Sequence, residues 1–513
     1  MLFEFVILLL IIVYSVYYTL KEKQDYWKKR KVPYVKPKLL FGNYMGYILQ
    51  KQFRPQITSD ICKQYPEEPY IGSFFGTEPA LIVQDPDLIK LITTKDFYYF
   101  SGKEVTNYAH KETLTRSLNF AGGDDWKILR LHMSPLFTSS KLKSMFPLII
   151  KSTTELQEYL EMEIRLSQKV NVRSLLARYT MDCVISCIFG INANSMKRDI
   201  SNNPFLIMGN LIFDTSISRG LKMVCRTMWP ALFYRLGYKL FDEQISKFFS
   251  GFFAEACKGR LEYGNKRNDF IDMIVEWKKI KYISSESLSN FKIGEKKISQ
   301  LEVTDDLLAG QSLALFGAGY KSTSTTVTFL LYELAKDQQI QNRVIEEVDS
   351  YFKKHDSIDY ECVNELSYLE ACIDETLRLY PVVGIVTREV MDDYTLPTGL
   401  HLKKEIHIHI PIYQIHRNPK NFPQPEIYRP ERFLGEERKK IKPFTFMPFG
   451  EGPRICIALR FTKMMMHAGL LTIFKKFKVE LAEDTPLKIN FKPTSLVTQA
   501  DPDIQLKFIP RNL

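Results

Sequence analysis

The chain has 513 residues, of which 45% are hydrophobic and 13% aromatic, so it can bury a large core and is not a disordered protein. No repeat, low-complexity tract or linker follows residue 50, and one large domain is expected despite the length. The net charge of +11 is spread without an aromatic-interleaved basic motif, which argues against nucleic-acid binding. Two interpretations of the charge stay open: a docking face for an acidic protein or anionic lipid, and a generally solvated surface.

The N-terminal residues predict a membrane anchor. Phe5 to Leu20 is almost wholly apolar and, at about 1.5 Å per residue, spans roughly 24 Å, near the thickness of a thin bilayer. No basic segment precedes this run and no small-residue cleavage site follows it, which disfavours a cleaved signal peptide. Basic residues lie downstream, so the positive-inside rule places the rest of the chain in the cytosol. We expect a transmembrane signal anchor over 1–20, a basic and proline-containing linker over 21–45, and a cytosolic catalytic domain over 46–513.

Past residue 50 the pattern is mainly helical with short strands, so the expected fold class is mainly α (α+β). Tyr70–Phe75 and Pro79–Val83 are typical of a hairpin. Long helices are expected over residues 140–165, 172–188, 205–218, 241–260 and 301–336. Alternation from Ile406 to Ile410 predicts a strand. His407 and His409 could bind a metal together, although the favoured interpretation is that they line the other face of this strand.

The cysteines point to one position. Eight are scattered without CxxC spacing, which argues against a zinc site and a secreted disulfide framework and fits a reducing compartment. Cys456 follows a Gly-rich loop that begins at Phe449, includes Arg454 and runs into an apolar helix. Glycine lets backbone lie close to a flat cofactor, and a helix N-terminus favours the thiolate that binds iron. The alternative is a buried structural cysteine; we interpret Cys456 as a candidate haem-thiolate ligand.

A glutamate and two arginines could form a buried network. Glu375 and Arg378 lie three residues apart on a helix that ends before Pro381. Their apolar neighbours favour a buried ion pair that must find further hydrogen-bond partners. Arg432, within Pro430–Phe433, could complete it.

Further donors could bind an anionic group. Trp126 and Arg130 lie four residues apart, on one face of a helix, and Arg388 could serve likewise. Taken singly, each is more often a surface or packing residue. Together with the cysteine loop, they favour a bound cofactor.

In this order the motifs resemble those of a microsomal cytochrome P-450, similar to the insect xenobiotic-metabolising (family 6-like) branch. The match runs the whole length, from Tyr26–Arg30 through Asp269–Asp272 to the cysteine loop. The resemblance implies a helical prism with a small β-rich lobe and haem b between a long central helix and that loop. By position it implies the following roles: Cys456 as axial iron ligand; Phe449 beside the thiolate; Trp126, Arg130, Arg388 and Arg454 as partners of the haem propionates; Glu375, Arg378 and Arg432 as the network that holds the loop.

The implied function is a haem-thiolate monooxygenase of the endoplasmic reticulum membrane. It would insert one oxygen atom of O2 into a lipophilic small molecule, with electrons from an NADPH-dependent reductase and, as a second donor, cytochrome b5. The expected substrate pocket is mostly apolar, and the sequence does not choose among plant toxins, insecticides, fatty acids and hormones. Its expected wall includes Phe120, Phe316, Val382, Val383 and Leu496.

Two departures from the family pattern matter. Ala458 stands where glycine is usual, which we regard as minor. In the central helix, Gly319 fits a kink over the haem, but Lys321 and Ser322 replace the usual acid and threonine. Ser322 keeps a hydroxyl, whereas protonated Lys321 cannot do a carboxylate's work.

Three interpretations follow for Lys321. It could point away from the iron, or it could slow or uncouple oxygen activation, in which case Lys321→Glu raises the product formed per NADPH. Alternatively, the chain could be a haem-thiolate isomerase or dehydratase, or an inactive haem protein.

Overall fold

The structure is a computed structural model that describes residues 2–197, 202–263, 266–290 and 296–511. Its helices are α1 (Leu2–Gln24), α2 (Tyr26–Lys29), α3 (Met45–Ile48), α4 (Arg54–Gln64), α5 (Pro86–Lys90), α6 (Gly123–Met133), α7 (Ser139–Leu166), α8 (Val172–Val184), α9 (Pro204–Ile212), α10 (Ile217–Met228), α11 (Pro230–Arg235), α12 (Glu243–Tyr263), α13 (Phe270–Ile280), α15 (Asp305–Lys336), α16 (Gln338–Lys354), α17 (Cys362–Glu365), α18 (Ser367–Leu379), α19 (Ile412–Ile415), α20 (Gly435–Lys439) and α21 (Leu459–Lys476).

The strands are short. They are β1 (Tyr70–Phe75), β2 (Glu78–Val83), β3 (Val170–Asn171), β4 (Tyr282–Glu286), β5 (Ile298–Glu302), β6 (Val386–Glu389), β7 (Tyr394–Thr395), β8 (His401–Leu402), β9 (His407–Ile410), β10 (Phe477–Leu481), β11 (Asn490–Phe491), β12 (Ala500–Asp501) and β13 (Gln505–Pro510). The expected mainly helical fold with a small β-rich lobe is therefore confirmed.

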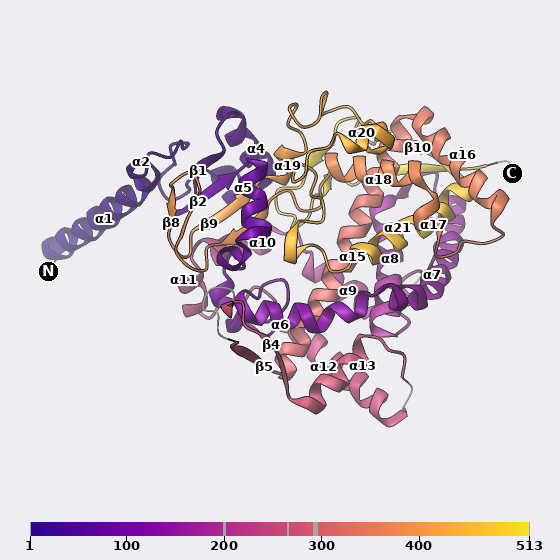
Figure 1. The fold of residues 1–513 in the computed structure, drawn as a ribbon, viewed down its shortest axis with the longest axis horizontal. Helices are drawn as coiled ribbons and strands as arrows, with labels where there is room; N and C mark the ends of the chain where they lie inside the picture. The colour runs from indigo at the N-terminus through magenta and orange to yellow at the C-terminus, as the bar shows by residue number, and fades with distance from the viewer. Residues whose placement is uncertain (1, 198–201, 264–265, 291–295, 512–513) are drawn as a thin grey trace.

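Helix α15 runs through the helical body, with α8, α18 and α21 packed around it (Figure 1). Thr304 caps its N-terminus, because the Thr304 side chain accepts a hydrogen bond from the Leu307 N–H. Acidic Asp305 and Asp306 in the first turn suit the positive end of the helix dipole. Almost every side chain in the C-terminal half of the helix is buried, so α15 is the core around which the other helices are arranged.

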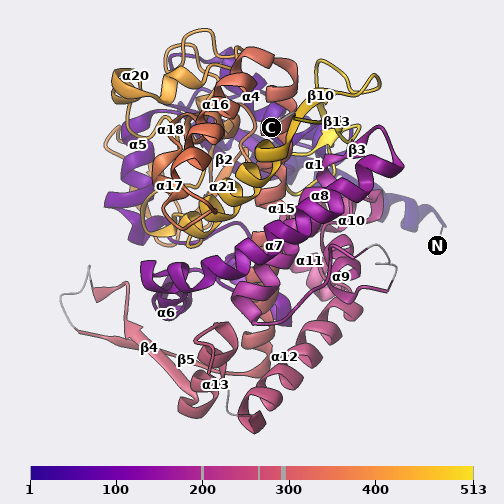
Figure 2. The same cartoon turned by 90° about the vertical axis from the view of Figure 1, so that its right-hand side faces the viewer.

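The β-rich lobe is built on a four-stranded sheet in the order β1-β2-β9-β6. β1 and β2 form the expected hairpin, and β9 pairs parallel to β2, with Ala80 opposite His407. β6 pairs antiparallel to β9, which sets Arg388 opposite Ile408. A second view shows the β4–β5 ribbon beside α12 and α13, far from this sheet (Figure 2). The sheet register thus brings Arg388 and the two histidines into one lobe.

The N-terminal helix α1 projects away from the body (Figure 1). The transmembrane span expected over residues 1–20 is not found: among the described residues, no helix is long and apolar enough to cross a membrane. Part of the expected linker over 21–45 packs on the sheet. Trp27 is fully buried, and its indole N–H donates to the Ser73 carbonyl at 2.9 Å. The position of Gly72 requires a glycine, because a Cβ there would lie 2.4 Å from the Trp27 ring.

Most of the expected helices are confirmed with small shifts at their ends, such as α7 for 140–165 and α12 for 241–260. The helix expected over 205–218 is wrong, since α9 ends at Ile212 and α10 begins at Ile217. The sequence feature that marks this break is Ser216, which caps the N-terminus of α10: its side chain accepts a hydrogen bond from the Arg219 N–H. The helix expected from residue 301 begins at Asp305, because the preceding residues pair as β5 with β4.

Candidate functional site

The cysteine loop is closed by its own backbone. The Cys456 N–H donates to the Phe449 carbonyl at 2.9 Å, and Cys456 lies just before the N-terminus of α21. Gly452 has a φ of +72°, and a Cβ there would lie 1.9 Å from the Thr93 carbonyl oxygen. This glycine therefore serves the turn and its contact with protein backbone, not only an approach to a cofactor. Ala458 has a φ of −100°, which any residue adopts, so it carries no backbone strain.

The charge environment of Cys456 is mixed. Burial raises the pKa of its thiol, while the Ala458 N–H and the Arg130 guanidinium lower it. The backbone N–H at the start of the helix and the nearby guanidinium thus both act in the direction of the thiolate, against the effect of burial. A bound metal ion would supply the missing positive charge.

Glu375, Arg378 and Arg432 form the expected buried network. Glu375 Oε2 accepts from Arg378 Nε at 2.7 Å, and Oε1 accepts from Arg378 Nη2 at 2.9 Å and from Arg432 Nε at 3.3 Å. The side chains of Glu375 and Arg378 are 0% exposed. The Arg429 N–H also donates to Glu375, at 2.8 Å. Four hydrogen bonds thus satisfy one buried carboxylate.

His416, which the sequence did not single out, connects this network to the cysteine loop. Its carbonyl accepts from Arg378 Nη1 at 2.9 Å, and its ring Nε2 accepts from the Met447 N–H at 2.9 Å. Burial lowers the pKa of His416 to about 3, so the ring is neutral and free to accept. Met447 lies only two residues before Phe449. The network therefore fixes the start of the loop that ends at Cys456.

Three cationic side chains converge on the region between the sheet lobe and the cysteine loop. Arg388 and Arg454 were expected to bind haem propionates. The structure adds Lys103, which lies near enough to both for their charges to lower its pKa. Burial, Arg454 and Arg388 lower the pKa of Lys103 to about 7. Burial lowers the pKa of Arg388 to about 10, and its Nε is buried without a hydrogen-bond partner. None of the three forms an ion pair with a carboxylate within the described part of the chain. Arg388 is buried, and Lys103 and Arg454 are half-buried. A cationic cluster of this kind fits an anionic group such as a propionate.

The other expected propionate partners are placed around the same cluster. The Arg454 guanidinium lies 4.7 Å from the centroid of the Trp126 ring. Its Nε and Nη2 donate to the Ser101 carbonyl at 2.9 and 2.6 Å, and Nη2 also donates to the Ala121 carbonyl. Arg130 instead donates from Nη1 to the Ile455 carbonyl at 2.9 Å, so it braces the cysteine loop directly.

The central helix presents one accessible face. Ala318 is exposed in the middle of the otherwise buried α15, and Ser322, one turn later, is partly exposed and donates its hydroxyl to the Ala318 carbonyl. Gly319 lies on another side: a Cβ there would be 2.6 Å from Val184 Cγ2 on α8. α15 stays an unbroken α-helix through these residues. Gly319 thus permits the packing of α8 on α15.

Lys321 does not share the face of Ser322. Its side chain lines a cavity together with Arg173, Asp503 and Tyr320, and the residue is 8% exposed. Burial and Arg173 lower the pKa of Lys321 to about 7. This orientation agrees with the first of the three interpretations, in which Lys321 points away.

The expected substrate wall is only partly brought together. The Thr498 N–H donates to the Val382 carbonyl at 3.0 Å, so the segment around Val382 and Val383 lies beside the strand-like segment after Leu496. Val383 and Leu496 are exposed. Phe120 is partly buried, with the Arg226 guanidinium 5.1 Å from its ring centroid.

Phe316, also expected in the wall, lies in an aromatic cluster. It is 0% exposed and packs against Phe205 and Phe249 in the core. Two residues along a helix turn by about 200°, which places Phe316 nearly opposite the accessible Ala318.

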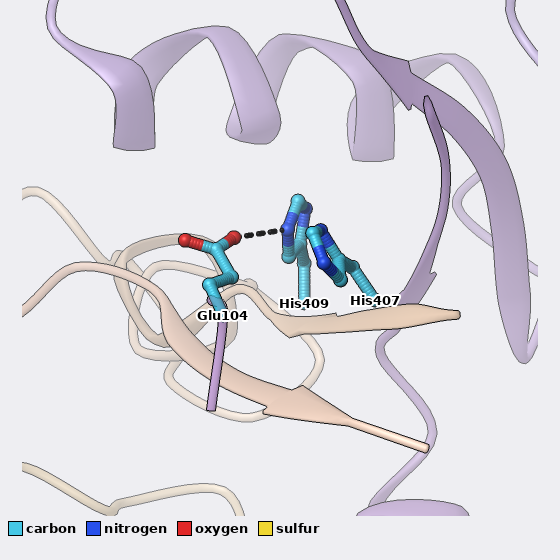
Figure 3. Close-up of side chains that lie close together, drawn as sticks. All are labelled: Glu104, His407 and His409. Carbon is cyan, nitrogen blue, oxygen red and sulfur yellow. Dashed lines mark hydrogen bonds and ion pairs between the residues drawn. The ribbon is translucent and has the colours of Figure 1, made fainter. Parts of the chain in front are cut away.

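His407, His409 and Glu104 lie together in the sheet lobe (Figure 3). Within the described residues, their ligand atoms form a group that could hold a metal. The Arg54 Nη2 already contacts this group, at 2.7 Å from Glu104 Oε1 and 3.0 Å from His409 Nε2. Burial lowers the pKa of His409 to about 4. The geometry favours a buried Arg–Glu–His network in which the guanidinium is the cation.

Comparison with known proteins supports one family. The family model described as Cytochrome P450 matches residues 32–508. Cytochrome P450 6B2 of Helicoverpa armigera is 31% identical, covering 99% of each chain. Cytochrome P450 6k1 of Blattella germanica is 33% identical over 98% of this chain and 95% of its own. Cytochrome P450 6A1 of Musca domestica is 33% identical over 92% and 91%.

Cytochromes P450 carry haem b on a cysteine thiolate, and the residues present here fit that group: a loop cysteine beside a helix N-terminus, and a cationic cluster that would suit the propionates. The chain therefore belongs to the cytochrome P450 family of haem monooxygenases.

Proposed function

We propose that this chain inserts one oxygen atom of O2 into a lipophilic small molecule, with electrons from an NADPH-dependent reductase. In this proposal Cys456 would hold the haem iron through its thiolate, and Phe449 would lie beside it. When bound, haem supplies oxygen activation. The protein's residues hold the ligand loop, bind the propionates and position the substrate.

The propionates would be bound by Arg388, Arg454 and Lys103, with Trp126 stacked beneath Arg454. The support for this is the convergence of buried Arg388 with half-buried Lys103 and Arg454, none of which forms an ion pair with a carboxylate among the described residues. Arg130 would act on the cysteine loop, where it contacts the Ile455 carbonyl. The Glu375 network would hold that loop through His416 and Met447.

One observation favours oxygenation over isomerase or dehydratase chemistry: Ser322 and Lys321 lie on different faces of α15. Ser322 lies with Ala318 on the accessible face of α15 and can donate its hydroxyl. Lys321 is turned into a different cavity. The replacement of the usual acid therefore places no ammonium group on the face that carries Ser322.

The N-terminal segment supports attachment to the endoplasmic reticulum membrane. The apolar residues Phe3, Phe5 and Leu10 on α1 are all exposed, and basic residues follow from Lys21. We propose that this segment binds the membrane with the catalytic body on the cytosolic side, where the reductase and cytochrome b5 could dock on basic residues. Deletion of residues 2–24 should release the protein from microsomes after carbonate extraction; retention in the membrane would contradict this assignment.

Reconstitution tests the reaction. The haem-loaded chain is mixed with reductase, NADPH and a panel of lipophilic compounds, and O2 and NADPH consumption are compared with product formation. Oxygen uptake that requires both NADPH and substrate supports the proposal. Rearrangement or dehydration of substrate without NADPH would instead indicate the alternative function.

Two matched variants test the assignment of the central helix. Ser322→Ala removes the hydroxyl, and we expect a severalfold fall in product per NADPH. Lys321→Glu should leave this ratio unchanged because the side chain points away. A higher ratio in Lys321→Glu would show that Lys321 does impair oxygen activation.

A further inference from the structure

A cavity of about 260 Å³ lies beside α15, on a side that includes neither Ala318 nor Ser322. Its lining comes from the start of α8, the end of α9, α15 itself and the segment before β13. Four charged residues face it: Arg173 and Arg178 on α8, Lys321 on α15, and Asp503. Tyr320 is a further titratable group in the lining, and burial raises its pKa to about 12, so it stays neutral.

The charges in this cavity do not balance. Three cationic side chains face a single carboxylate. Asp503 is already shared, since its oxygens lie 3.6 Å from Arg173 Nη1 and 3.5 Å from both Asn171 Nδ2 and Gln499 Nε2. With Lys321 protonated, the four side chains carry a net charge of two positives.

Two of the cations each have a nitrogen without a hydrogen-bond acceptor among the described residues. Arg173 Nη1 is buried and donates to no acceptor. The Lys321 ammonium donates no hydrogen bond to any described residue; its contact is with the Tyr320 ring, at 4.6 Å from the centroid. Arg178 is partly engaged, because its Nη1 donates to the Lys197 carbonyl at 3.3 Å. Arg173 is half-buried and shares Asp503, whereas Lys321 is buried and forms no ion pair with a described residue. An excess of positive charge in such a place is costly unless an anion approaches it.

We propose that this cavity binds a small oxyanion of charge −2, a dicarboxylate or a phosphate, between Lys321 and Arg173. The volume far exceeds the roughly 30 Å³ of one water molecule, so a ligand of several non-hydrogen atoms can enter. The planar guanidinium of Arg173 matches two oxygens of a carboxylate or phosphate, and the ammonium supplies a third donor. Such a ligand would offset the two excess positive charges of the cavity and keep Lys321 protonated.

Calorimetric titration of the haem-loaded full-length protein tests this site. Succinate, its uncharged analogue succinamide and inorganic phosphate are titrated separately in chloride buffer at constant ionic strength. We expect succinate or phosphate to bind with one-to-one stoichiometry and succinamide not to bind. Binding of succinate alone identifies a carboxylate site, and binding of phosphate alone identifies a phosphate site. Absence of binding by both anions, or equal binding of succinamide, would overturn the proposal.

Variants locate the binding to this cavity. Lys321→Met and Arg173→Gln should each weaken the anion that binds by at least about tenfold, since each removes a charged hydrogen bond. The control is Lys478→Met, which removes an exposed lysine from β10 and should leave the affinity unchanged. If Lys321→Met does not fold, Lys321→Gln removes the charge with a polar replacement. Unchanged affinity in both the position-321 variant and Arg173→Gln would show that the anion binds elsewhere and would refute the assignment.

Discussion

The replacement of Glu375 by alanine should have a large effect on the stability of this cytochrome P450. The carboxylate accepts four hydrogen bonds, from Arg378, Arg432 and the Arg429 backbone. Its removal leaves the fully buried guanidinium of Arg378 without a counter-charge. Breaking a buried pair by removing one partner costs about 3–5 kcal/mol. Since whole domains are stable by only about 5–15 kcal/mol, Glu375→Ala should lose a large part of that margin.

Urea unfolding of the haem-loaded protein, followed by far-ultraviolet circular dichroism, measures this loss. The carbon monoxide difference spectrum should also weaken, because His416 and Met447 no longer hold the start of the cysteine loop. A matched control is Glu436→Ala: Glu436 and Lys439 form an ion pair with the same three-residue spacing, but both side chains are exposed. That variant should change the unfolding free energy by no more than about 0.5 kcal/mol.

A double variant separates the ion pair from the packing. In Glu375→Met with Arg378→Met, both charges are replaced by apolar groups of similar length, and stability should partly recover relative to the single Glu375→Met variant. The reasoning is refuted if Glu375→Ala loses less than about 1 kcal/mol, the value of an exposed pair. It is also refuted if the double variant is as unstable as the sum of the single ones.

Three further changes test individual contacts. Gly319→Ala should lower the free energy of unfolding by about 1–3 kcal/mol, because the added methyl group clashes with Val184. Combining it with Val184→Ala should restore part of this loss. If the double variant is no more stable than Gly319→Ala, Gly319 serves something other than helix packing. Lys103→Met should speed the transfer of haem to a globin acceptor about tenfold, which corresponds to a loss of about 1.4 kcal/mol in the barrier to haem release. The control variant Lys478→Met should release haem at the wild-type rate. If Lys103→Met also releases haem at the wild-type rate, Lys103 does not belong to the propionate site. Lys321→Met should stabilise the protein at pH 7 in oxyanion-free buffer. Burial lowers the pKa of Lys321 to about 7 in the folded protein, from 10.5 for an ordinary lysine. Between these two pH values the unfolded chain binds the proton and the folded chain does not. The free energy of unfolding of the wild type therefore rises with pH from about 7 to 10.5. The advantage of Lys321→Met should therefore shrink between pH 7 and pH 10, and a constant advantage would contradict the assigned pKa.

Chemistry that depends on local spacing could be predicted from the sequence. The Gly-rich loop identified Cys456, and the i,i+3 spacing among apolar neighbours identified the buried pair of Glu375 and Arg378. The hairpin at Tyr70 followed from alternation and turn residues. In each case the decisive neighbours lie within a few residues of one another, so the pattern contains the information.

What only the tertiary structure decided is which distant groups meet and which way a side chain points. Lys103 joins Arg388 and Arg454 across hundreds of residues, and the sequence around it carries no signal of that contact. From the sequence we expected Lys321 among the catalytic residues and Phe316 in the substrate wall. In the structure, Lys321 lines another cavity and Phe316 is fully buried, so neither shares the accessible face of Ser322. A helical residue's surroundings are set by the elements that pack on its own face, and α8 and α12 take those faces here. The sequence alone therefore singled out Cys456 as the candidate ligand, while helix packing decided that Lys321 lines a separate cavity, the one that we propose binds an anion.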